Sequence, residues 1–424
     1  MTTAPHDIRR VCVLGLGYIG LPLAATLATR GVDLIGVDID EGVVAAIEAG
    51  RSHFAEPDLD MLVQAAIKTG RLTATTRPQP ADAYVIAVPT PLRSDCAADL
   101  SAVEAACRSL APVLTKGALV VVESTCPIGT TEQVCRWLGE ERPDLAAPSQ
   151  DAPGDYAVAY CPERILPGRM LFELIENDRV IGGVTPDCAR RAEALYRLFV
   201  RGALVRTSAR VAEAVKLAEN AYRDVNIAFA NELAALSERV GIDVWEVIGL
   251  ANRHPRVDIL RPGPGVGGHC IAIDPWFLIA AAPEAAPLMT AARNVNDARP
   301  GTVVARALAR VADVAAPRIA CLGLAYKANV DDTRESPAVE IVSRLAEAGC
   351  TVRAVDPHVR RLPAKLSDAP GVRLVDLDTA LDGCDLVLLL VGHDAFAGAV
   401  ERLRRLPVLD TVGLLRAGGA SHNR

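Results

Sequence analysis

A short apolar run that ends in three spaced glycines restricts the possible folds of this chain more than any other feature. Val11 to Leu14 is followed by Gly15, Gly17 and Gly20, and residues 21–29 then have the composition of a helix. Glycines at this spacing between a strand and a helix let the backbone turn tightly and approach a pyrophosphate at the helix N-terminus. The pattern predicts a doubly wound α/β domain that binds a dinucleotide.

The end of the next apolar run indicates which dinucleotide binds. Residues 32–37 are followed by Asp38, at the spacing where a carboxylate binds the ribose hydroxyls. This carboxylate would repel a 2′-phosphate, so the predicted cofactor is NAD rather than NADP. A doubly wound domain that binds another nucleotide is the alternative.

Polar residues also follow the later apolar runs in this half of the chain. Ligands of open α/β sheets lie beyond the carboxyl ends of the strands, so these residues are candidates to line a site. Glu163 and Arg164 follow the run at 157–160 and suggest a carboxylate near the chemistry and a cation near an anionic substrate, or else a surface salt bridge. Three threonines are candidate cofactor contacts, each with a helix cap as its alternative role: Thr90, Thr125 and Thr131.

Residues 208–240 contain no glycine or proline and predict one long helix, suited to join domains and to form a dimer surface. Lys216, Asn220 and Arg223 stand at positions i, i+4 and i+7 and therefore share one face. A Lys and an Asn there are suited to hold a reacting hydroxyl and stabilise an oxyanion; a solvated stripe is the alternative. The neighbouring residues predict a packed apolar arc: Ala212, Val215, Ala218, Ala221, Tyr222 and Val225.

A stretch rich in glycine and proline, residues 263–277, carries the cysteine Cys270 and then Asp274. Glycines let a backbone come close to a ligand, so a cysteine in this place is suited to act as a nucleophile. A buried, inert cysteine beside a tight turn is the alternative. Shortly before this stretch, His254 and Arg256 are candidates to clamp a phosphate or sugar, or are plain surface residues.

The composition narrows the class of protein. A chain of 424 residues predicts two or three domains, and 50% hydrophobic but only 4% aromatic residues suit buried parallel strands covered by helices. The net charge of −7 argues against nucleic-acid binding. The eleven cysteines are scattered without a CxxC pair, which predicts neither a metal site nor a disulfide scaffold. Free thiols, with no apolar signal and no membrane-spanning run, predict a cytoplasmic protein without a membrane partner.

The last third of the chain repeats the α/β pattern without the full glycine signature. Apolar runs at 318–324, 351–355 and 385–391 predict a second sheet. Lys327 and Arg334 follow the first of these runs. They are suited to bind a nucleotide diphosphate, although two surface cations after a strand are the alternative.

The order of the motifs resembles that of the UDP-glucose/GDP-mannose dehydrogenase family. The resemblance covers nearly the whole chain, because its motifs extend from the first glycine loop to about residue 340 and the C-terminal runs also fit. Within the family, AYCPERILPG, NDRVIGG, NRHPRVDIL and GHCIAIDPWF are most similar to members that oxidise UDP-N-acetyl-D-mannosamine. The motifs that carry the family resemblance are GLGYIGLP, VPTP, ESTCPIGTT, CPER, EAVKLAEN, GPGVGGHCIAIDP and GLAYKANVDDTRESP.

This resemblance implies a fold and an activity. The fold is an N-terminal NAD-binding Rossmann domain (1–207), a central helical domain with a spine helix and the cysteine loop (208–300), and a C-terminal Rossmann-like domain for the UDP-sugar (301–424). The activity is a four-electron oxidation of the C6 hydroxyl of UDP-N-acetyl-D-mannosamine by two NAD in turn, for surface polysaccharide synthesis. UDP-N-acetylglucosamine and UDP-glucose are alternative substrates. A homodimer or larger homo-oligomer is expected, with some substrate contacts from the partner subunit.

The resemblance also implies roles for individual residues. A base assisted by Lys216 removes the hydroxyl proton, and the Cys270 thiolate then attacks the aldehyde to give a thiohemiacetal and a thioester. Water activated near Glu163 or Asp274 hydrolyses the thioester, while Lys216 and Asn220 stabilise the oxyanions. The resemblance also assigns Thr125 to the catalytic residues. The implied NAD contacts are Gly15, Gly17, Tyr18, Ile19, Gly20, Asp38, Thr90, Thr131 and Arg334. The implied UDP-sugar contacts are Arg164, Ile165, Lys216, Asn220, Arg223, His254, Arg256, Gly267, Tyr326 and Lys327.

Two other functions fit parts of the sequence. A two-electron β-hydroxyacid dehydrogenase also joins a Rossmann domain to a long helix with Lys and Asn, but it needs neither the third domain nor Cys270. A nucleotide-sugar sensor without activity has no use for the Lys216, Asn220 and Cys270 set.

Overall fold

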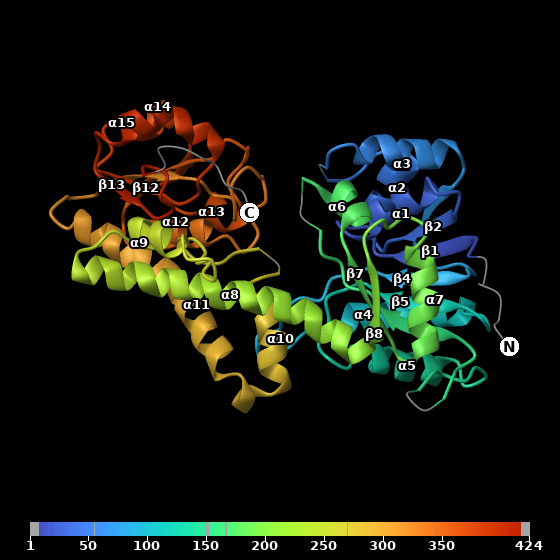
Figure 1. Cartoon of the computed structure of the whole chain (residues 1–424). Helices are drawn as coiled ribbons and strands as arrows, with labels where there is room; N and C mark the ends of the chain where they lie inside the picture. The colour runs from blue at the N-terminus through green and yellow to red at the C-terminus, as the bar shows by residue number, and fades with distance from the viewer. Residues whose placement is uncertain (1–7, 55, 150–151, 166–167, 269, 417–424) are drawn as a thin grey trace. The chain divides into compact units, whose positions relative to one another are not determined.

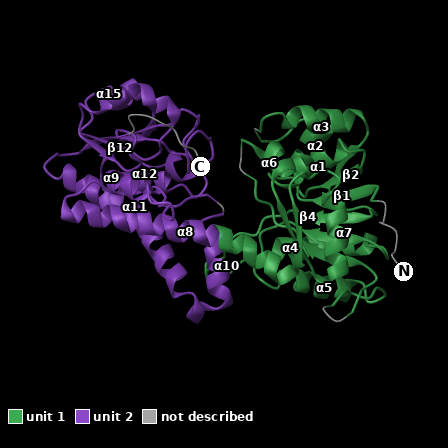
Figure 2. Cartoon of the chain, viewed as in Figure 1, with its two compact units in different colours: residues 1–219 green, residues 220–424 purple. Residues whose placement is uncertain are grey.

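The computed structural model describes residues 8–54, 56–149, 152–165, 168–268 and 270–416. The chain divides into two compact units, residues 1–219 and 220–424 (Figure 2). The division falls inside one long helix, α8, which extends from Ala209 to Val240. Each unit has its own sheet and its own apolar cores.

Unit 1 is built on an eight-stranded sheet with the order β3-β2-β1-β4-β5-β6-β7-β8 (Figure 1). All neighbouring strands are parallel except β6 and β7, which are antiparallel. The first six strands follow the doubly wound order: β2 and β3 are added on one side of β1, and β4, β5 and β6 on the other. The strands are β1 Arg10–Leu14, β2 Asp33–Val37, β3 Leu72–Thr75, β4 Ala83–Ile86, β5 Leu119–Val122, β6 Ala157–Tyr160, β7 Arg179–Gly183 and β8 Leu204–Ser208.

Helices cover both faces of this sheet because successive strand residues point to opposite sides. Val11 and Val13 belong to the core beneath α1, α3 and α7, and Cys12 and Leu14 belong to the core beneath α4 and α5. The helices of unit 1 that precede α8 are α1 Gly20–Ala28, α2 Glu41–Glu48, α3 Leu59–Lys68, α4 Ser101–Leu110, η1 Ala111–Val113, α5 Thr130–Glu141, α6 Met170–Glu176 and α7 Pro186–Tyr196.

Unit 2 contains a five-stranded parallel sheet with the order β11-β10-β9-β12-β13. One core lies between this sheet and α11 and α12, and a second lies on the opposite face under α14 and α15. The strands are β9 Arg318–Leu322, β10 Thr351–Val355, β11 Val372–Leu374, β12 Leu386–Leu389 and β13 Val408–Asp410. The helices are α9 Val244–Ala251, α10 Asp274–Ala281, η2 Pro283–Ala285, α11 Pro287–Arg310, α12 Pro337–Glu347, α13 Ala364–Ser367, α14 Leu377–Leu381, η3 Asp394–Ala399 and α15 Val400–Leu403.

Buried polar side chains join α8 to α11 in unit 2. Arg293 forms an ion pair with Asp224, and both side chains are at most 2% exposed. The amide of Asn296 donates to the carboxylate of Asp224 at 2.8 Å and accepts from Asn231 at 3.0 Å. Asn231 also accepts the backbone N–H of Gly263 at 2.9 Å, so the network fixes the start of the glycine-rich stretch. A buried network of this kind specifies one relative position of its helices.

The predicted fold class is confirmed by the mostly parallel sheet of unit 1, the parallel sheet of unit 2 and the long helix that lies between them in the sequence. The helix α8 coincides within a residue with the predicted span 208–240. The prediction that Ala218 and Tyr222 pack in an apolar arc is wrong, because both are exposed, Tyr222 to 67%. The boundaries of the three predicted domains stay a prediction, since the chain divides into two compact units.

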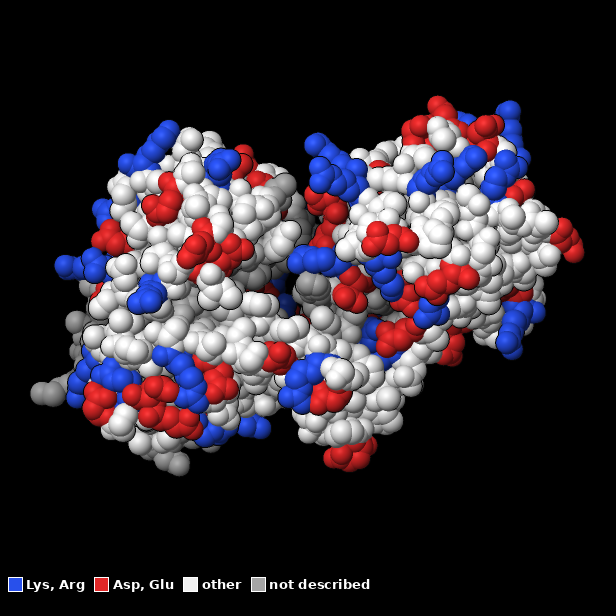
Figure 3. Space-filling view, turned by 180° about the vertical axis from the view of Figure 1, so that it is seen from behind, with Lys and Arg blue, Asp and Glu red and all other residues white. Residues whose placement is uncertain are grey.

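Surface charge of both signs is spread over the molecule. On the face drawn in Figure 3, basic and acidic side chains alternate and do not form one large basic area. Across the residues that the structure describes, no helix is both long and apolar enough to span a membrane.

Candidate active site

The first glycine loop lies at the carboxyl end of β1, between the ends of β2 and β4. Gly15 has φ +89°, and a Cβ added there would stand 2.5 Å from the carbonyl oxygen of Ala87. A Cβ on Gly20 would stand 1.8 Å from the carbonyl oxygen of Gly15. At Gly17 an added Cβ meets nothing within 4 Å. The chain itself therefore requires glycine at 15 and 20, whereas the open space at Gly17 fits a ligand that approaches the backbone.

Asp38 follows β2 and holds this loop. Its Oδ2 accepts the backbone N–H of Leu16 at 2.9 Å, and its Oδ1 accepts the N–H of Asp40 at 3.0 Å. The carboxylate is half-buried beside the loop, where it fits the ribose diol of a dinucleotide. Tyr18 is 38% exposed, and its ring centroid lies 4.3 Å from that of Phe54. Ile19 is the residue before α1.

Two of the three predicted threonines, Thr90 and Thr125, are in contact beyond the ends of β4 and β5, and Thr131 lies in the first turn of α5. The hydroxyl of Thr90 donates to the carbonyl oxygen of Thr125 at 2.6 Å. Thr131 is fully buried, and both its hydroxyl and its backbone N–H donate to Glu213 of α8, at 2.6 and 2.7 Å. Glu213 also accepts the N–H of Gly129, so its carboxylate occupies the N-terminus of α5. Burial raises the pKa of Glu213. The sequence reasoning did not assign Glu213, although the motif EAVKLAEN contains it.

A buried ionic cluster lies behind the carboxyl ends of β5 and β6. Glu163 is 6% exposed and forms an ion pair with Arg179, which is 1% exposed. The alternative of a surface salt bridge therefore does not hold for Glu163. Beside this pair, the hydroxyl of Tyr196 donates to Glu123 at 2.5 Å. Burial, together with the charge of Glu163, raises the pKa of Glu123 to about 8. Glu123, Arg179 and Tyr196 had not been predicted; the position of Glu123 directly after a strand was the available signal.

The first half of α8 contacts this cluster through Lys216 and Glu219. Lys216 is 8% exposed, and its Nζ donates to the backbone carbonyl of Glu163 at 2.7 Å. Arg164 forms an ion pair with Glu219 of α8 at 2.7 Å, and its backbone N–H donates to Glu163 at 2.6 Å. Ile165 is half-buried against the core of unit 1. The structure thus brings together the predicted residues Glu163, Arg164 and Lys216.

Within unit 2, the continuation of α8 meets the segment that carries Cys270. Asn220 and Asp274 are 1% and 2% exposed, and the amide of Asn220 donates to the Asp274 carboxylate. Arg223 is exposed and donates to the other end of the Asn220 amide. The backbone N–H of Asp274 donates to the carbonyl of Cys270 at 2.9 Å, in the turn that begins α10. Asn220, Arg223, Cys270 and Asp274 are therefore neighbours.

Cys270 is the exposed member of the eleven cysteines, all of which are described and none of which forms a disulfide. Of the other ten cysteines, eight are buried and two, Cys96 and Cys384, are half-buried. Burial raises the pKa of one of the buried thiols, Cys161, to about 12. The alternative of a buried, inert Cys270 is wrong. An exposed thiol is accessible to an electrophile, whereas a buried thiol of raised pKa is not.

The glycines before Cys270 let the loop pack tightly on the first loop of the second sheet. A Cβ on Gly267 would stand 2.5 Å from the carbonyl oxygen of Glu335. Gly268 has φ +81°, and its added Cβ would meet the ring of Tyr326 at 3.0 Å. Glycine is required at both positions. Gly267 and Tyr326, both predicted substrate contacts, thus lie close together.

A cavity of about 150 Å³ lies beside Tyr326 and Lys327, between the loop after β9 and the start of α12. The Nζ of Lys327 lies 5.9 Å from the centroid of the Tyr326 ring. Asp356 fixes the loop, because its Oδ2 accepts the N–H groups of Leu324 and Ala325 at 2.7 and 3.0 Å. This Oδ2 also lies 3.1 Å from Nε2 of the buried His393. The cavity offers an aromatic ring and a cation, which suit a nucleotide.

The remaining predicted contacts lie on the surface of unit 2. His254 and Arg256 are exposed, and Nδ1 of His254 accepts the N–H of Arg256 at 3.3 Å. Arg334 is exposed and forms an ion pair with Asp332 at 2.6 Å. Their roles stay predictions. The described part of the chain contains no group of three or more His, Cys, Asp and Glu side chains arranged to hold a metal ion.

Three family models match the chain, and together they span most of it. They are described as the NAD binding domain, the central domain and the UDP binding domain of the UDP-glucose/GDP-mannose dehydrogenase family, and they match residues 9–200, 210–298 and 320–417. The predicted cofactor, NAD, is confirmed by the first model.

Individual proteins agree with these models. The chain is 54% identical over 414 residues to an NDP-N-acetyl-D-galactosaminuronic acid dehydrogenase of Ralstonia nicotianae, covering 97% of each chain. It is 51% identical over 394 residues to a UDP-N-acetyl-D-mannosamine dehydrogenase of Campylobacter jejuni, covering 92% of this chain and 97% of the relative. The solved structure of a UDP-D-ManNAc dehydrogenase from Pyrococcus horikoshii is 38% identical, covers 97% of both chains and superposes with a TM-score of 0.87. The chain belongs to the UDP-glucose/GDP-mannose dehydrogenase family and is an NAD-dependent nucleotide-sugar dehydrogenase.

Proposed function

We propose that the chain oxidises the C6 hydroxyl of UDP-N-acetyl-D-mannosamine to the carboxylate of UDP-N-acetyl-D-mannosaminuronate, a building block for surface polysaccharide. The reaction removes four electrons and passes through a thiohemiacetal and a thioester on Cys270. The observation that carries the proposal is the exposed thiol of Cys270 on a close-packed glycine loop, one helical turn before the buried Asp274.

Each group has a chemical task in this proposal. Lys216 assists removal of the hydroxyl proton, and the sulfur of Cys270 then adds to the aldehyde carbon, so the aldehyde stays bound between the two oxidations. Lys216 and Asn220 stabilise the negative charge that develops on oxygen. Glu163 or Asp274 orients and deprotonates the water that cleaves the thioester, and Thr125 completes the catalytic set. The buried positions of Glu163, Lys216, Asn220 and Asp274 support these tasks, since charges act more strongly away from water.

The N-terminal glycine loop is the proposed holder of the cofactor. When bound, NAD accepts a hydride in each oxidation. Gly15, Gly17 and Gly20 form the cradle for its pyrophosphate, and Asp38 takes the ribose hydroxyls. The open space at Gly17 supports this assignment. Further proposed contacts are Tyr18, Ile19, Thr90, Thr131 and Arg334.

The cavity beside Lys327 is the proposed site of the uridine diphosphate. Its aromatic ring and its cation support this assignment, as does the match of the UDP binding domain model to this region. Residues on three segments complete the proposed substrate contacts: Arg164, Ile165, Lys216, Asn220, Arg223, His254, Arg256, Gly267 and Tyr326.

The experiment that tests the function counts NADH formed per UDP-sugar consumed. UDP-N-acetylmannosamine, UDP-N-acetylgalactosamine, UDP-N-acetylglucosamine and UDP-glucose are compared side by side, because relatives of similar identity carry names with different sugars. Two NADH per molecule with the mannosamine compound alone is the expected result. Two NADH with another sugar would keep the mechanism and correct the substrate.

The Cys270→Ser variant supplies the matched control for this count. It retains the fold and the sites for both ligands but lacks the thiol, so at most one NADH per sugar and no uronate are expected. Normal uronate formation by this variant would contradict the thioester mechanism. A single NADH per sugar from the unmodified enzyme would instead favour a two-electron dehydrogenase.

We also infer that the chain forms a homodimer through α8. Tyr222, Phe229 and Leu236 are spaced seven residues apart and are 67%, 54% and 55% exposed, and Val240 is 59% exposed. A stripe of exposed apolar side chains along one helix is typical of a helix-packing interface. Light scattering is expected to give twice the chain mass, and Phe229→Glu is expected to lower it to one chain. A monomeric unmodified protein would contradict the inference.

A further inference from the structure

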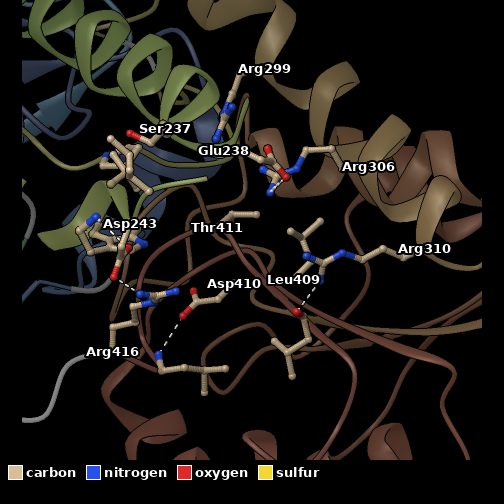
Figure 4. A pocket seen from close by; sticks show the side chains of 17 residues that line it. Ser237, Glu238, Asp243, Arg299, Arg306, Arg310, Leu409, Asp410, Thr411 and Arg416 are labelled. Carbon is tan, nitrogen blue, oxygen red and sulfur yellow. Dashed lines mark hydrogen bonds and ion pairs between the residues drawn. The ribbon is translucent and has the colours of Figure 1, made fainter. Parts of the chain in front are cut away.

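A cavity of about 350 Å³ in unit 2 is lined by an unusual number of arginines (Figure 4). Arg299, Arg306 and Arg310 enter it from α11, where their spacing of seven and four residues puts them on one face. Arg416 approaches from the segment after β13, and the end of α8 and the start of α9 complete the walls. The cavity shares no lining residue with the one beside Lys327.

The acidic side chains that line the cavity already have partners within the protein. Glu238 forms an ion pair with Arg306 at 2.7 Å. Asp243 forms an ion pair with Arg416. The carboxylate of Asp410 accepts three backbone N–H groups, from residues 412, 413 and 415. Within the described residues, Arg299 and Arg310 therefore have no carboxylate partner.

Arg299 is the most deeply placed of these cations. Arg299 is 6% exposed. Its one hydrogen bond to a described residue is donated by Nε to the carbonyl oxygen of Gly263 at 2.9 Å. Burial, and then the neighbouring charge of Arg306, lower the pKa of Arg299 to about 10. The charge of Glu238 opposes this shift, but Glu238 is ion-paired with Arg306. Burial of a guanidinium is costly, so a bound anion would offset the cost.

Two further donors at this cavity lack partners among the described residues. Ser237 is 1% exposed, and its buried hydroxyl makes no hydrogen bond. The Nε of Arg306 is also buried without an acceptor. Buried donors in native proteins almost always have a hydrogen-bond acceptor, so each unsatisfied donor indicates that an acceptor is missing. Two unsatisfied donors, one on α8 and one on α11, therefore lie beside the Arg299 guanidinium at this cavity.

We propose that this cavity is a second anion-binding site that takes a phosphate group of a small molecule. Several guanidinium groups with a hydroxyl match the oxygens of a phosphate, and Arg presents planar pairs of donors to such groups. The volume exceeds that of inorganic phosphate, so a phosphorylated sugar or a pyrophosphate also fits. The cavity contains none of the residues to which the proposed oxidation assigns a role.

Occupation of the site is linked to the loop that carries Cys270. Arg299 donates to the carbonyl of Gly263, the first residue of the stretch that leads to this cysteine. An anion that binds the terminal nitrogens of Arg299 fixes its side chain and with it the carbonyl of Gly263. Since such coupling is reciprocal, a ligand that orders the loop also strengthens anion binding.

The test measures thermal unfolding and calorimetric binding of the full chain with inorganic phosphate, pyrophosphate and glucose 1-phosphate. Sodium chloride at equal ionic strength serves as the reference. A saturable rise in melting temperature is expected with at least one phosphate compound and not with chloride. The tightest of the three identifies free phosphate, a diphosphate or a sugar phosphate as the ligand class.

Charge-removing variants locate the binding. Arg299→Gln and Arg310→Gln are each expected to weaken the anion about tenfold or more, since each removes charge-assisted hydrogen bonds. Arg310 is exposed, so its variant keeps the proposal testable if Arg299→Gln fails to fold. The matched control is Arg373→Gln, on β11 at the opposite edge of the same sheet from β13. Equal stabilisation by chloride, or unchanged phosphate binding in Arg310→Gln, would overturn the proposal.

Discussion

The amide of Asn220 donates a hydrogen bond to the carboxylate of Asp274, across 54 residues of sequence and with both groups buried. This bond ties α8 to the first turn of α10 and orients a carboxylate one turn beyond Cys270. Arg223 donates to the same amide from the solvent side. The amide therefore has a fixed orientation, with its nitrogen toward Asp274 and its oxygen toward Arg223.

Asp274→Asn is expected to separate the two halves of the reaction. The substitution keeps the volume and the hydrogen-bonding reach of the side chain but removes a base, so thioester hydrolysis slows while the first hydride transfer continues. A rapid burst of NADH followed by a steady state at least about a hundredfold slower is expected. Stopped-flow absorbance measures both phases. Asp313→Asn, in the exposed turn after α11, is the control, and equal loss of burst and steady state in Asp274→Asn would contradict this role.

Gly17→Ala and Gly20→Ala are expected to fail for different reasons. The added methyl group at position 20 would lie 1.8 Å from the carbonyl of Gly15, so the variant should lose stability or not fold. At position 17 the structure has room, so the melting temperature should stay unchanged while NAD affinity falls about tenfold or more. Thermal unfolding and calorimetric titration with NAD distinguish the two. Normal NAD affinity in folded Gly17→Ala would place the cofactor elsewhere.

Glu123 is expected to make the enzyme less stable in alkali. Its pKa is raised to about 8 by burial and the charge of Glu163, so the folded state binds more protons than the unfolded state between about pH 4.3 and pH 8. Stability therefore falls as the pH rises through that window. Glu123→Gln cannot ionise and should gain stability relative to the unmodified protein as the pH rises from 5 to 9. Glu246→Gln, on the exposed side of α9, should show no such trend.

Asp356 has the opposite dependence on pH. Burial raises its pKa, but hydrogen bonds from His393 and from the backbone of Leu324 and His358 outweigh this and hold it well below its usual value. Its contribution is fully present above the unfolded pKa near 3.9 and is lost as the pH falls from that value through the lower pKa of the folded state. Asp356→Asn should cost about 2 kcal/mol in the free energy of unfolding at pH 7, and less below pH 4. The exposed Asp378→Asn is the control; a cost independent of pH would contradict the assignment.

The sequence predicted those parts of the molecule that depend on local pattern. The absence of glycine and proline over 33 positions was enough to locate α8, and the end of β2 at Asp38 placed a carboxylate beside the glycine loop because parallel strands end at the same edge. Cys270 was identified through its flanking glycines, whose tight packing on Tyr326 explains why they are there.

Contacts between distant segments were not predictable in the same way. Glu163 meets Arg179 and Tyr196 meets Glu123 because β5, β6 and β7 are neighbours, and no local period reports that pairing. The helical spacing around Tyr222 predicted which residues share a face of α8, but not whether another segment covers that face. Thr131 illustrates a further limit, since its hydroxyl is held by a residue 82 positions later in the chain.

The same joint, a hydrogen bond between an aspartate and a loop, occurs in both sheets but differs in burial. In each sheet an aspartate at the end of the second strand accepts a backbone N–H from the loop after the first, Leu16 for Asp38 and Leu324 for Asp356. At Asp38 the joint remains half-exposed, whereas Asp356 is buried against His393. Redesign of cofactor preference therefore has a natural starting point at position 38. Restoring a third glycine to the second sheet would not make it a dinucleotide site, because the carboxylate that would hold the ribose is sealed inside the protein.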